Sequence, residues 1–157
     1  MIVVSDTSPL NYLVWIGAVN ILPDLFGGIA IPEAVHRELL DAGAPEPVRA
    51  WALRLPSWVA VHPTQADDAT LDLDPGETEA IALSETLRAG LLLMDDRKAV
   101  DAARTRGLTV IGTLGLLVRG AQAGLIDATA LDRLQATNFR ASARLFQSMG
   151  KLISQAR

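Results

Sequence analysis

Short apolar runs alternate along this chain with longer segments in which apolar residues recur every three or four positions. A short run rich in Val, Ile or Leu is typical of a buried strand, whereas the longer spacing is typical of a helix with one buried face. The pattern predicts strands at residues 2–4, 29–31, 58–61, 91–94 and 109–111. It predicts helices at residues 10–19, 33–40, 48–55, 77–89, 97–106 and 114–123, with one or two more from residue 128 onward.

Strands that alternate with helices of about ten residues indicate a parallel sheet covered by helices, and therefore an α/β fold. The 157 residues contain no internal repeat and no linker long enough to separate two domains, so a single domain over residues 1–157 is expected. Its last segment, residues 138–157, combines an apolar stripe with Arg140, Arg144 and Lys151. We expect this basic amphipathic helical tail to pack on the core or bind a partner, in preference to contacting RNA.

Composition narrows the class of protein. Half of the residues are hydrophobic, yet no run approaches the roughly 20 apolar residues of a membrane span. The absence of cysteine excludes disulfides and thiolate metal sites and suits the reducing cytoplasm. With only two histidines, any bound metal would have mainly oxygen ligands, which favours Mg²⁺ or Mn²⁺. The net charge of −4 argues against a broadly basic protein that coats nucleic acid.

Asp6 is the one acidic residue in the apolar opening of the chain, directly after the first predicted strand. Ser8 suits a helix N-cap and Pro9 the first helical position, so Asp6 is expected at the carboxyl end of a core strand. Ligands bind at that edge of open α/β sheets. A buried carboxylate there must be hydrogen-bonded, ion-paired or bound to metal. The alternative is that Asp6 only caps the following helix.

Two adjacent acids follow the fourth predicted strand. Asp95 and Asp96 are expected at the same sheet edge as Asp6, because the carboxyl ends of parallel strands meet there. A helix N-cap would require only one of the two acids. Arg97 and Lys98 could instead neutralise part of this negative charge.

Three glutamates on predicted helices complete the set of candidate acids. Glu38 borders the apolar face of its helix, although a solvated position paired with Arg37 or Arg49 is an alternative. Glu79 lies among apolar residues near the start of a later helix, whereas Glu77 could serve only to cap that helix. Several carboxylates without matching cations would repel one another, and a divalent cation would relieve that repulsion.

Five segments occur in a recognisable order: VSDTSPL at 4–10, IPEAV at 31–35 with Glu38-Leu39, PGETEAIAL at 75–83, LLMDDR at 92–97 and VIGT at 110–113. In this order they resemble the PIN-domain family, specifically the PIN-like branch of small prokaryotic proteins related to VapC-type toxins. The resemblance runs from about residue 2 to residue 135.

The resemblance implies a three-layer α/β/α sandwich with a central, mainly parallel sheet. It also implies a cytoplasmic ribonuclease that cuts single-stranded RNA with Mg²⁺ or Mn²⁺, as the toxin of a toxin–antitoxin pair. The implied partners are single-stranded or structured RNA, an antitoxin protein and a second copy of the chain in a homodimer, with no membrane. By matching motif, the implied catalytic acids are Asp6, Glu38, Glu79 and Asp96. The implied metal ligands are Asp6, Glu38, Glu77, Glu79, Asp95 and Asp96, with Glu79 preferred over Glu77. Expected substrate contacts are Thr7, Ser8 and Arg97.

One departure concerns substrate handling. Relatives often carry Gly-Arg shortly after the Asp-Asp pair, where this chain has Ala99-Val100. Two other functions are consistent with the sequence. One is a PIN-like module that binds RNA or protein without cutting. The other is a Mg²⁺-dependent phosphohydrolase, which would need a phosphate-binding loop that we do not find.

Overall fold

The structure is a computed structural model that describes residues 1–63 and 71–156. Its strands are β1 (Val3–Ser5), β2 (Ile29–Pro32), β3 (Val59–His62), β4 (Leu91–Leu93) and β5 (Val110–Ile111). They form one sheet in the order β3-β2-β1-β4-β5, and every neighbouring pair is parallel. The carboxyl ends of all five strands therefore share one edge. β2 and β3 follow on one side of β1 and β4 and β5 on the other, so the carboxyl ends of β1 and β4 form the expected ligand-binding position.

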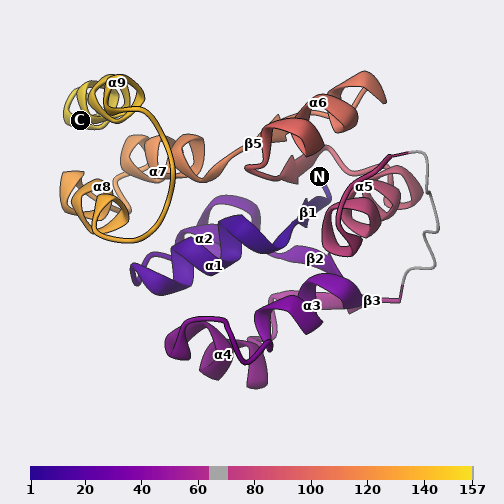
Figure 1. The fold of residues 1–157 in the computed structure, drawn as a ribbon. Helices are drawn as coiled ribbons and strands as arrows, with labels where there is room; N and C mark the ends of the chain where they lie inside the picture. Colours follow the sequence, from indigo (N-terminus) through magenta and orange to yellow (C-terminus); the bar gives the residue numbers. More distant parts are fainter. Residues whose placement is uncertain (64–70, 157) are drawn as a thin grey trace.

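Helices connect these strands and cover both faces of the sheet (Figure 1). Those in the described part of the chain are α1 (Thr7–Trp15), α2 (Ile21–Phe26), α3 (Glu33–Leu39), α4 (Glu46–Leu53), α5 (Pro75–Leu87), α6 (Arg97–Thr105), α7 (Thr113–Gln122), α8 (Ala128–Gln135) and α9 (Ala143–Ser154). No helix in residues 1–63 or 71–156 is long and apolar enough to cross a membrane.

Alternate residues of the central strands belong to two separate apolar clusters, one on each face of the sheet. Val3 and Leu93 belong to the larger cluster, which includes residues of α1, α2, α4, α7, α8 and α9. Val4 and Leu92 point to the opposite face and pack with α5 and α6. This alternation follows from the two-residue period of a strand. The predicted three-layer α/β/α sandwich is confirmed.

The start of α1 corrects one prediction. The helix begins at Thr7, so Asp6 occupies the N-cap position, and the expectation that Ser8 would cap the helix is wrong. The Asp6 side chain makes no capping hydrogen bond either. The hydroxyl groups of Thr7 and Ser8 instead reach acidic side chains elsewhere in the fold. Pro9 is consequently the third helical residue, where its missing N–H still costs no helical hydrogen bond.

The C-terminal segment forms α8 and α9. Phe146 and Ile153 of α9 are buried in the larger cluster, and the helix packs against α7 and α8. Arg157, the last residue of the predicted tail, lies outside the described residues.

Candidate active site

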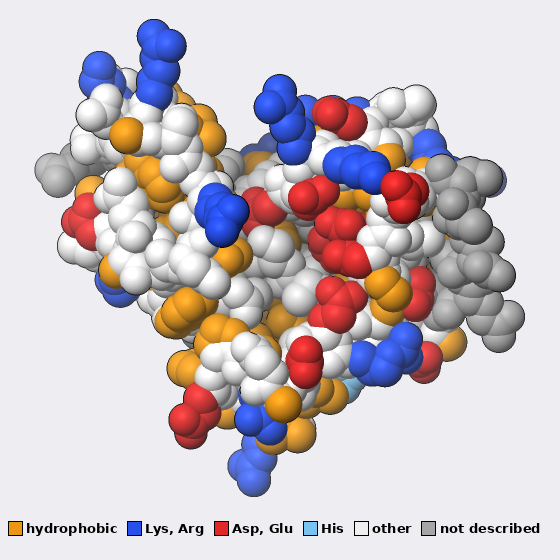
Figure 2. All heavy atoms as spheres, in the orientation of Figure 1, with side chains coloured by type: hydrophobic (Ala, Val, Ile, Leu, Met, Phe, Trp, Pro, Cys, Tyr) orange, Lys and Arg blue, Asp and Glu red, His pale blue; other side chains and the backbone are white. Residues whose placement is uncertain are grey.

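A cleft of about 650 Å³ opens at the carboxyl ends of β1 and β4. Its walls come from the start of α1, from α3, from the start of α5, from the β4–α6 turn and from the connection between α8 and α9. Acidic side chains gather over this hollow of the surface (Figure 2). The carboxyl groups that line it are Asp6, Glu38, Asp74, Glu77, Asp95 and Asp96.

Asp6 is the most deeply buried of these acids, with 4% of its surface exposed. Its backbone N–H donates to the Leu93 carbonyl at 2.9 Å, which continues the pairing of β1 with β4. Its Oδ1 atom is buried and has no hydrogen-bond partner among the described residues. Burial raises the pKa of Asp6 well above its usual value, and the nearby charges of Glu77, Asp74 and Glu38 act in the same direction.

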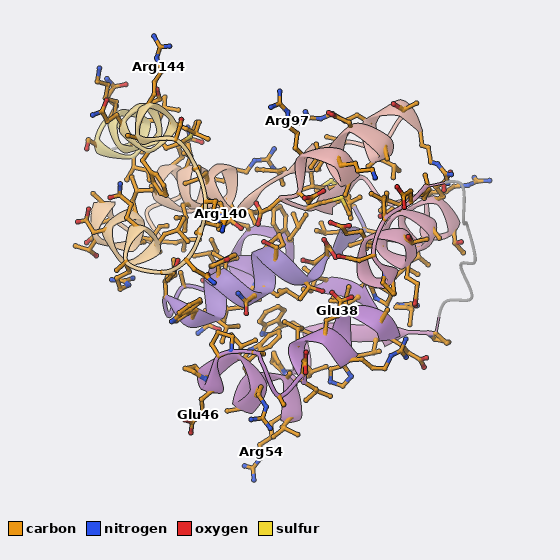
Figure 3. The ribbon with its side chains drawn as sticks, viewed as in Figure 1. Glu38, Glu46, Arg54, Arg97, Arg140 and Arg144 are labelled. Atoms are coloured by element: carbon orange, nitrogen blue, oxygen red, sulfur yellow. The ribbon has the colours of Figure 1, made fainter. Side chains whose placement is uncertain are left out.

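Glu38 approaches Asp6 from α3. Thr7 donates its hydroxyl to Glu38 Oε1 at 3.0 Å, whereas Oε2 is buried with no hydrogen-bond partner in the described structure. Burial raises the pKa of Glu38, whereas the Thr7 hydroxyl and the Gly76 N–H oppose that rise. The carboxyl group therefore faces the cleft and is not a solvated partner of Arg37 or Arg49; it lies between α3 and α5 near the centre of this face (Figure 3).

Asp95 is held by three donors. Ser8 Oγ donates to its Oδ2 atom at 2.6 Å, and Thr113 Oγ1 donates to the same atom at 2.6 Å. The Thr113 N–H donates to Oδ1 at 2.7 Å. Gly112 permits this close approach, because a Cβ there would lie 2.8 Å from Asp95 Oδ1. Ser8 and Thr113 therefore fix Asp95 from two different helices.

Asp96 has a different role from its neighbour. Its Oδ2 atom accepts a hydrogen bond from the Ala99 N–H at 3.1 Å, so Asp96 is the N-cap of α6. It remains exposed at the rim of the cleft. The pair therefore serves two helix starts, because Asp96 caps α6 and Asp95 accepts the first N–H of α7.

Glu77 and Asp74 form a capping box at the start of α5. The Glu77 N–H donates to Asp74 Oδ1 at 2.8 Å, and the Asp74 N–H donates to Glu77 Oε1 at 3.3 Å. Burial, together with the charges of Asp74 and Asp96, raises the pKa of Glu77 to about 7. Sequence reasoning missed Asp74 as a cleft residue, because Asp-Pro-Gly indicated only the start of a helix.

Glu79 does not line the cleft. It is buried and lies 3.7 Å from the Arg37 guanidinium, measured from Oε2 to an Nη atom. Residues two apart on an α-helix point about 200° apart, so Glu79 lies on a different side of α5 from Glu77, although its charge still contributes to raising the pKa of Glu38. The structure brings Glu77 to the acidic cleft and leaves Glu79, the acid preferred from the sequence, on another face of α5.

Other polar side chains form the rest of the wall. Arg97 lines the cleft at the start of α6, as do Thr7 and Ser8 at the start of α1. A further group comes from α1 and from the α8–α9 connection: Asn11, Tyr12, Asn138, Phe139 and Arg140. The sequence indicated Arg140 only as part of the basic tail, for which packing or partner binding was preferred to an RNA contact.

Residues 2–155 match the sequence model of a family described as PIN domain. The chain belongs to the PIN-domain family. PIN domains are generally nucleases and typically use divalent metal ions. A solved structure with a similar fold is a PilT N-terminus domain protein from the hyperthermophilic archaeon Sulfolobus solfataricus P2. It shares 18% identity, with a TM-score of 0.53, over 90% of this chain and 100% of its own. A search of the curated proteins found no match.

The acidic cleft of this PIN domain is lined by carboxylate oxygens, which are suitable ligands for a divalent cation. In residues 1–63 and 71–156, no three His, Cys, Asp or Glu side chains converge as a metal-binding group. Most of the acids are already held by protein donors, but Asp6 Oδ1 and Glu38 Oε2 are not. Leaving a buried carboxylate oxygen without a donor costs free energy, and such oxygens are the ligands that Mg²⁺ and Mn²⁺ prefer. Asp6 and Glu38 are therefore the two residues that fit a cation best.

Proposed function

We propose that this PIN domain is a metal-dependent ribonuclease that hydrolyses phosphodiester bonds in single-stranded RNA. The pair of buried oxygens without donors, Asp6 Oδ1 and Glu38 Oε2, carries this proposal. Both line a cleft in which burial raises the pKa of Asp6, with a further contribution from the nearby negative charges. Asp6 and Glu38 would hold Mg²⁺ or Mn²⁺, with Asp95 and Asp96 as further ligands.

The chain's own side chains position these acids and handle the substrate. Thr7 orients Glu38 through its hydroxyl group, and Ser8 orients Asp95 in the same way. Glu77, a cleft acid whose Oε1 atom is used in the capping box, is suited to accept a proton from the attacking water at Oε2. Arg97 would contact a phosphate oxygen at the start of α6. A bound divalent cation would polarise the attacking water and offset charge on the phosphate.

We extend the proposal to a toxin-like role in the cytoplasm, with an antitoxin protein and a second copy of the chain as partners. This extension rests on the VapC-like order of motifs. Two exposed leucines on α9, Leu145 and Leu152, lie seven residues apart and so share one face of the helix. These two side chains form the exposed apolar surface of α9 to which we assign a partner protein.

A second candidate is a PIN domain that binds RNA without cutting it. The absence of a converged group of metal ligands from the described residues favours this candidate. It predicts RNA binding that neither Mn²⁺ nor the acidic residues affect.

Cleavage of a labelled single-stranded RNA separates the two candidates. We expect the wild type to cut in Mg²⁺ or Mn²⁺ and not in EDTA, and Asp6→Asn to lower the rate by more than about 100-fold. Asp132→Asn, which removes an exposed carboxylate of α8 outside the cleft, should cut like the wild type. Cleavage that survives Asp6→Asn would indicate a contaminating nuclease and contradict the proposed site.

Metal binding has its own measurement. Millimolar Mn²⁺ should raise the melting temperature of the wild type and of Asp132→Asn, because a ligand that binds only the folded state stabilises it. The increase should be smaller in Asp6→Asn. An equal increase in all three proteins would place the metal elsewhere.

A further inference from the structure

The connection between α8 and α9 brings a basic residue to the acidic cleft. Residues 136–142 cross from the end of α8 to the start of α9, and Asn138, Phe139 and Arg140 line the same cleft as Asp6. Arg140 lies over the interior of this face, whereas Arg144, on the first turn of α9, points away from it (Figure 3). Of these two arginines, four residues apart, Arg140 lines the cleft and Arg144 does not.

Aromatic packing fixes this connection. The Phe139 ring packs edge to face against the rings of Tyr12 and Phe146, with centroid separations of 5.0 Å and 6.3 Å respectively. The Tyr12 hydroxyl donates to Asn138 Oδ1 at 2.8 Å. The backbone next to Arg140 is therefore held by side chains of both α1 and α9, which positions Arg140 before any ligand binds.

Arg140 is exposed and makes no ion pair or hydrogen bond with another described residue. Its charge nevertheless acts inside the cleft. Burial and the charge of Asp95 raise the pKa of Tyr12, and the charge of Arg140 opposes that rise. A guanidinium group without a carboxylate partner thus stands across the cleft from acids that would hold a cation. A ligand with two anionic groups could bind the cation held by the acids through one phosphate and the Arg140 guanidinium through the other group.

We propose that Arg140 is a substrate-positioning residue that binds a backbone phosphate next to the scissile phosphate of the RNA, an inference that rests on the proposed function. The guanidinium group presents a planar fork of N–H donors that matches a phosphate. Arg97 at the start of α6 is the other basic residue that lines the cleft.

Binding of a fluorescent single-stranded RNA tests this role without cleavage when every protein carries Asp6→Asn. In that background, Arg140→Ala should weaken binding about tenfold, the cost of one charged hydrogen-bonding contact. The slope of log K against log salt should decrease in magnitude by about 0.7, the value for one phosphate contact on a single strand. Arg140→Lys should keep the slope, because the charge remains.

Arg144→Ala is the matched control, since it removes the same charge from the same segment and outside the cleft. It should leave affinity and slope unchanged. Equal affinity and slope for the Arg140→Ala and Arg144→Ala proteins would overturn the role of Arg140. Equal melting temperatures for Arg140→Ala and its parent would show that the fold is intact.

If the protein is not a ribonuclease, the experiments give a result different from the one that overturns the role of Arg140. A wild type that cuts no RNA, together with a reduced salt slope for Arg140→Ala, would contradict the ribonuclease and leave Arg140 as a phosphate contact. In an active enzyme with Asp6 restored, Arg140→Ala should raise KM about tenfold and leave kcat within about twofold. A loss confined to kcat would contradict the positioning role.

Discussion

Gly76 on α5 lies directly against the carboxyl group of Glu38 on α3. A Cβ atom at position 76 would lie 2.8 Å from Glu38 Cδ, a distance at which one of the two groups must move. The absence of a side chain at Gly76 therefore gives Glu38 its place in the cleft.

Gly76→Ala should separate activity from stability. The new methyl group would displace the Glu38 carboxylate, so we expect cleavage to fall by at least about tenfold. Alanine is favoured over glycine within a helix by up to about 1 kcal/mol. This gain should offset the cost of displacing Glu38, so the melting temperature should change little. Gly150→Ala on α9 is the control, because its Cβ would meet Leu131 at an ordinary 3.4 Å. A Gly76→Ala protein with wild-type activity would show that the position of Glu38 is not critical.

Glu77 and Glu79 can be distinguished by single substitutions. We expect Glu77→Gln to reduce cleavage more than about 100-fold and Glu79→Gln to reduce it only a few-fold. The reason is that Glu77 lines the cleft, whereas Glu79 faces Arg37. Rates at saturating Mn²⁺ would measure the difference. The reverse order would support the sequence-based preference for Glu79.

Stability should depend on pH in the absence of divalent ions. A carboxyl group with a raised pKa in the folded state contributes stability below its unfolded pKa and loses that contribution as pH rises through the folded value. For Glu77 this window runs from the ordinary 4.5 to about 7, and Asp6 acts in the same direction. We expect the free energy of unfolding, measured by urea titration in EDTA, to fall across this window.

Two variants test the source of that slope. Glu77→Gln should flatten the pH dependence, because glutamine does not titrate. Glu46→Gln, on the exposed end of α4 away from the cleft, should keep the wild-type slope (Figure 3). A wild-type slope in Glu77→Gln would show that other groups cause the pH dependence.

The sheet and three of its acids were predictable because their signals are local. A strand followed by an acid and a helix places Asp6 and Asp95 at one sheet edge, whatever the side-chain packing. The position of Glu38 likewise followed from the apolar face of its helix. Strand direction and helix period placed these acids near the sheet edge, but the motif resemblance was needed to prefer the cleft over a helix cap for Asp6 and over a solvated position for Glu38.

The remaining features depend on packing that the sequence does not show directly. The choice between Glu77 and Glu79 depends on the rotation of α5, which is set by the burial of Ala80 and Ile81 against the sheet. The hydroxyl of Ser8 was expected at a helix cap, but Asp95, far away in the sequence, accepts its hydrogen bond. Arg140 reaches the cleft only because Phe139 anchors the α8–α9 connection.

The position of β1 at the centre of the sheet has a consequence for synthesis. Of the five strands, β1, which leads into Asp6, leaves the ribosome first, but its Val3 pairs with Leu91, and the Thr113 donors that hold Asp95 come later still. The cleft therefore cannot be completed on a nascent chain until residue 113 has emerged, and Arg140 joins it last. Asp6 and Glu38 can thus meet early in synthesis, whereas Asp95 is fixed beside them only after Thr113 has emerged.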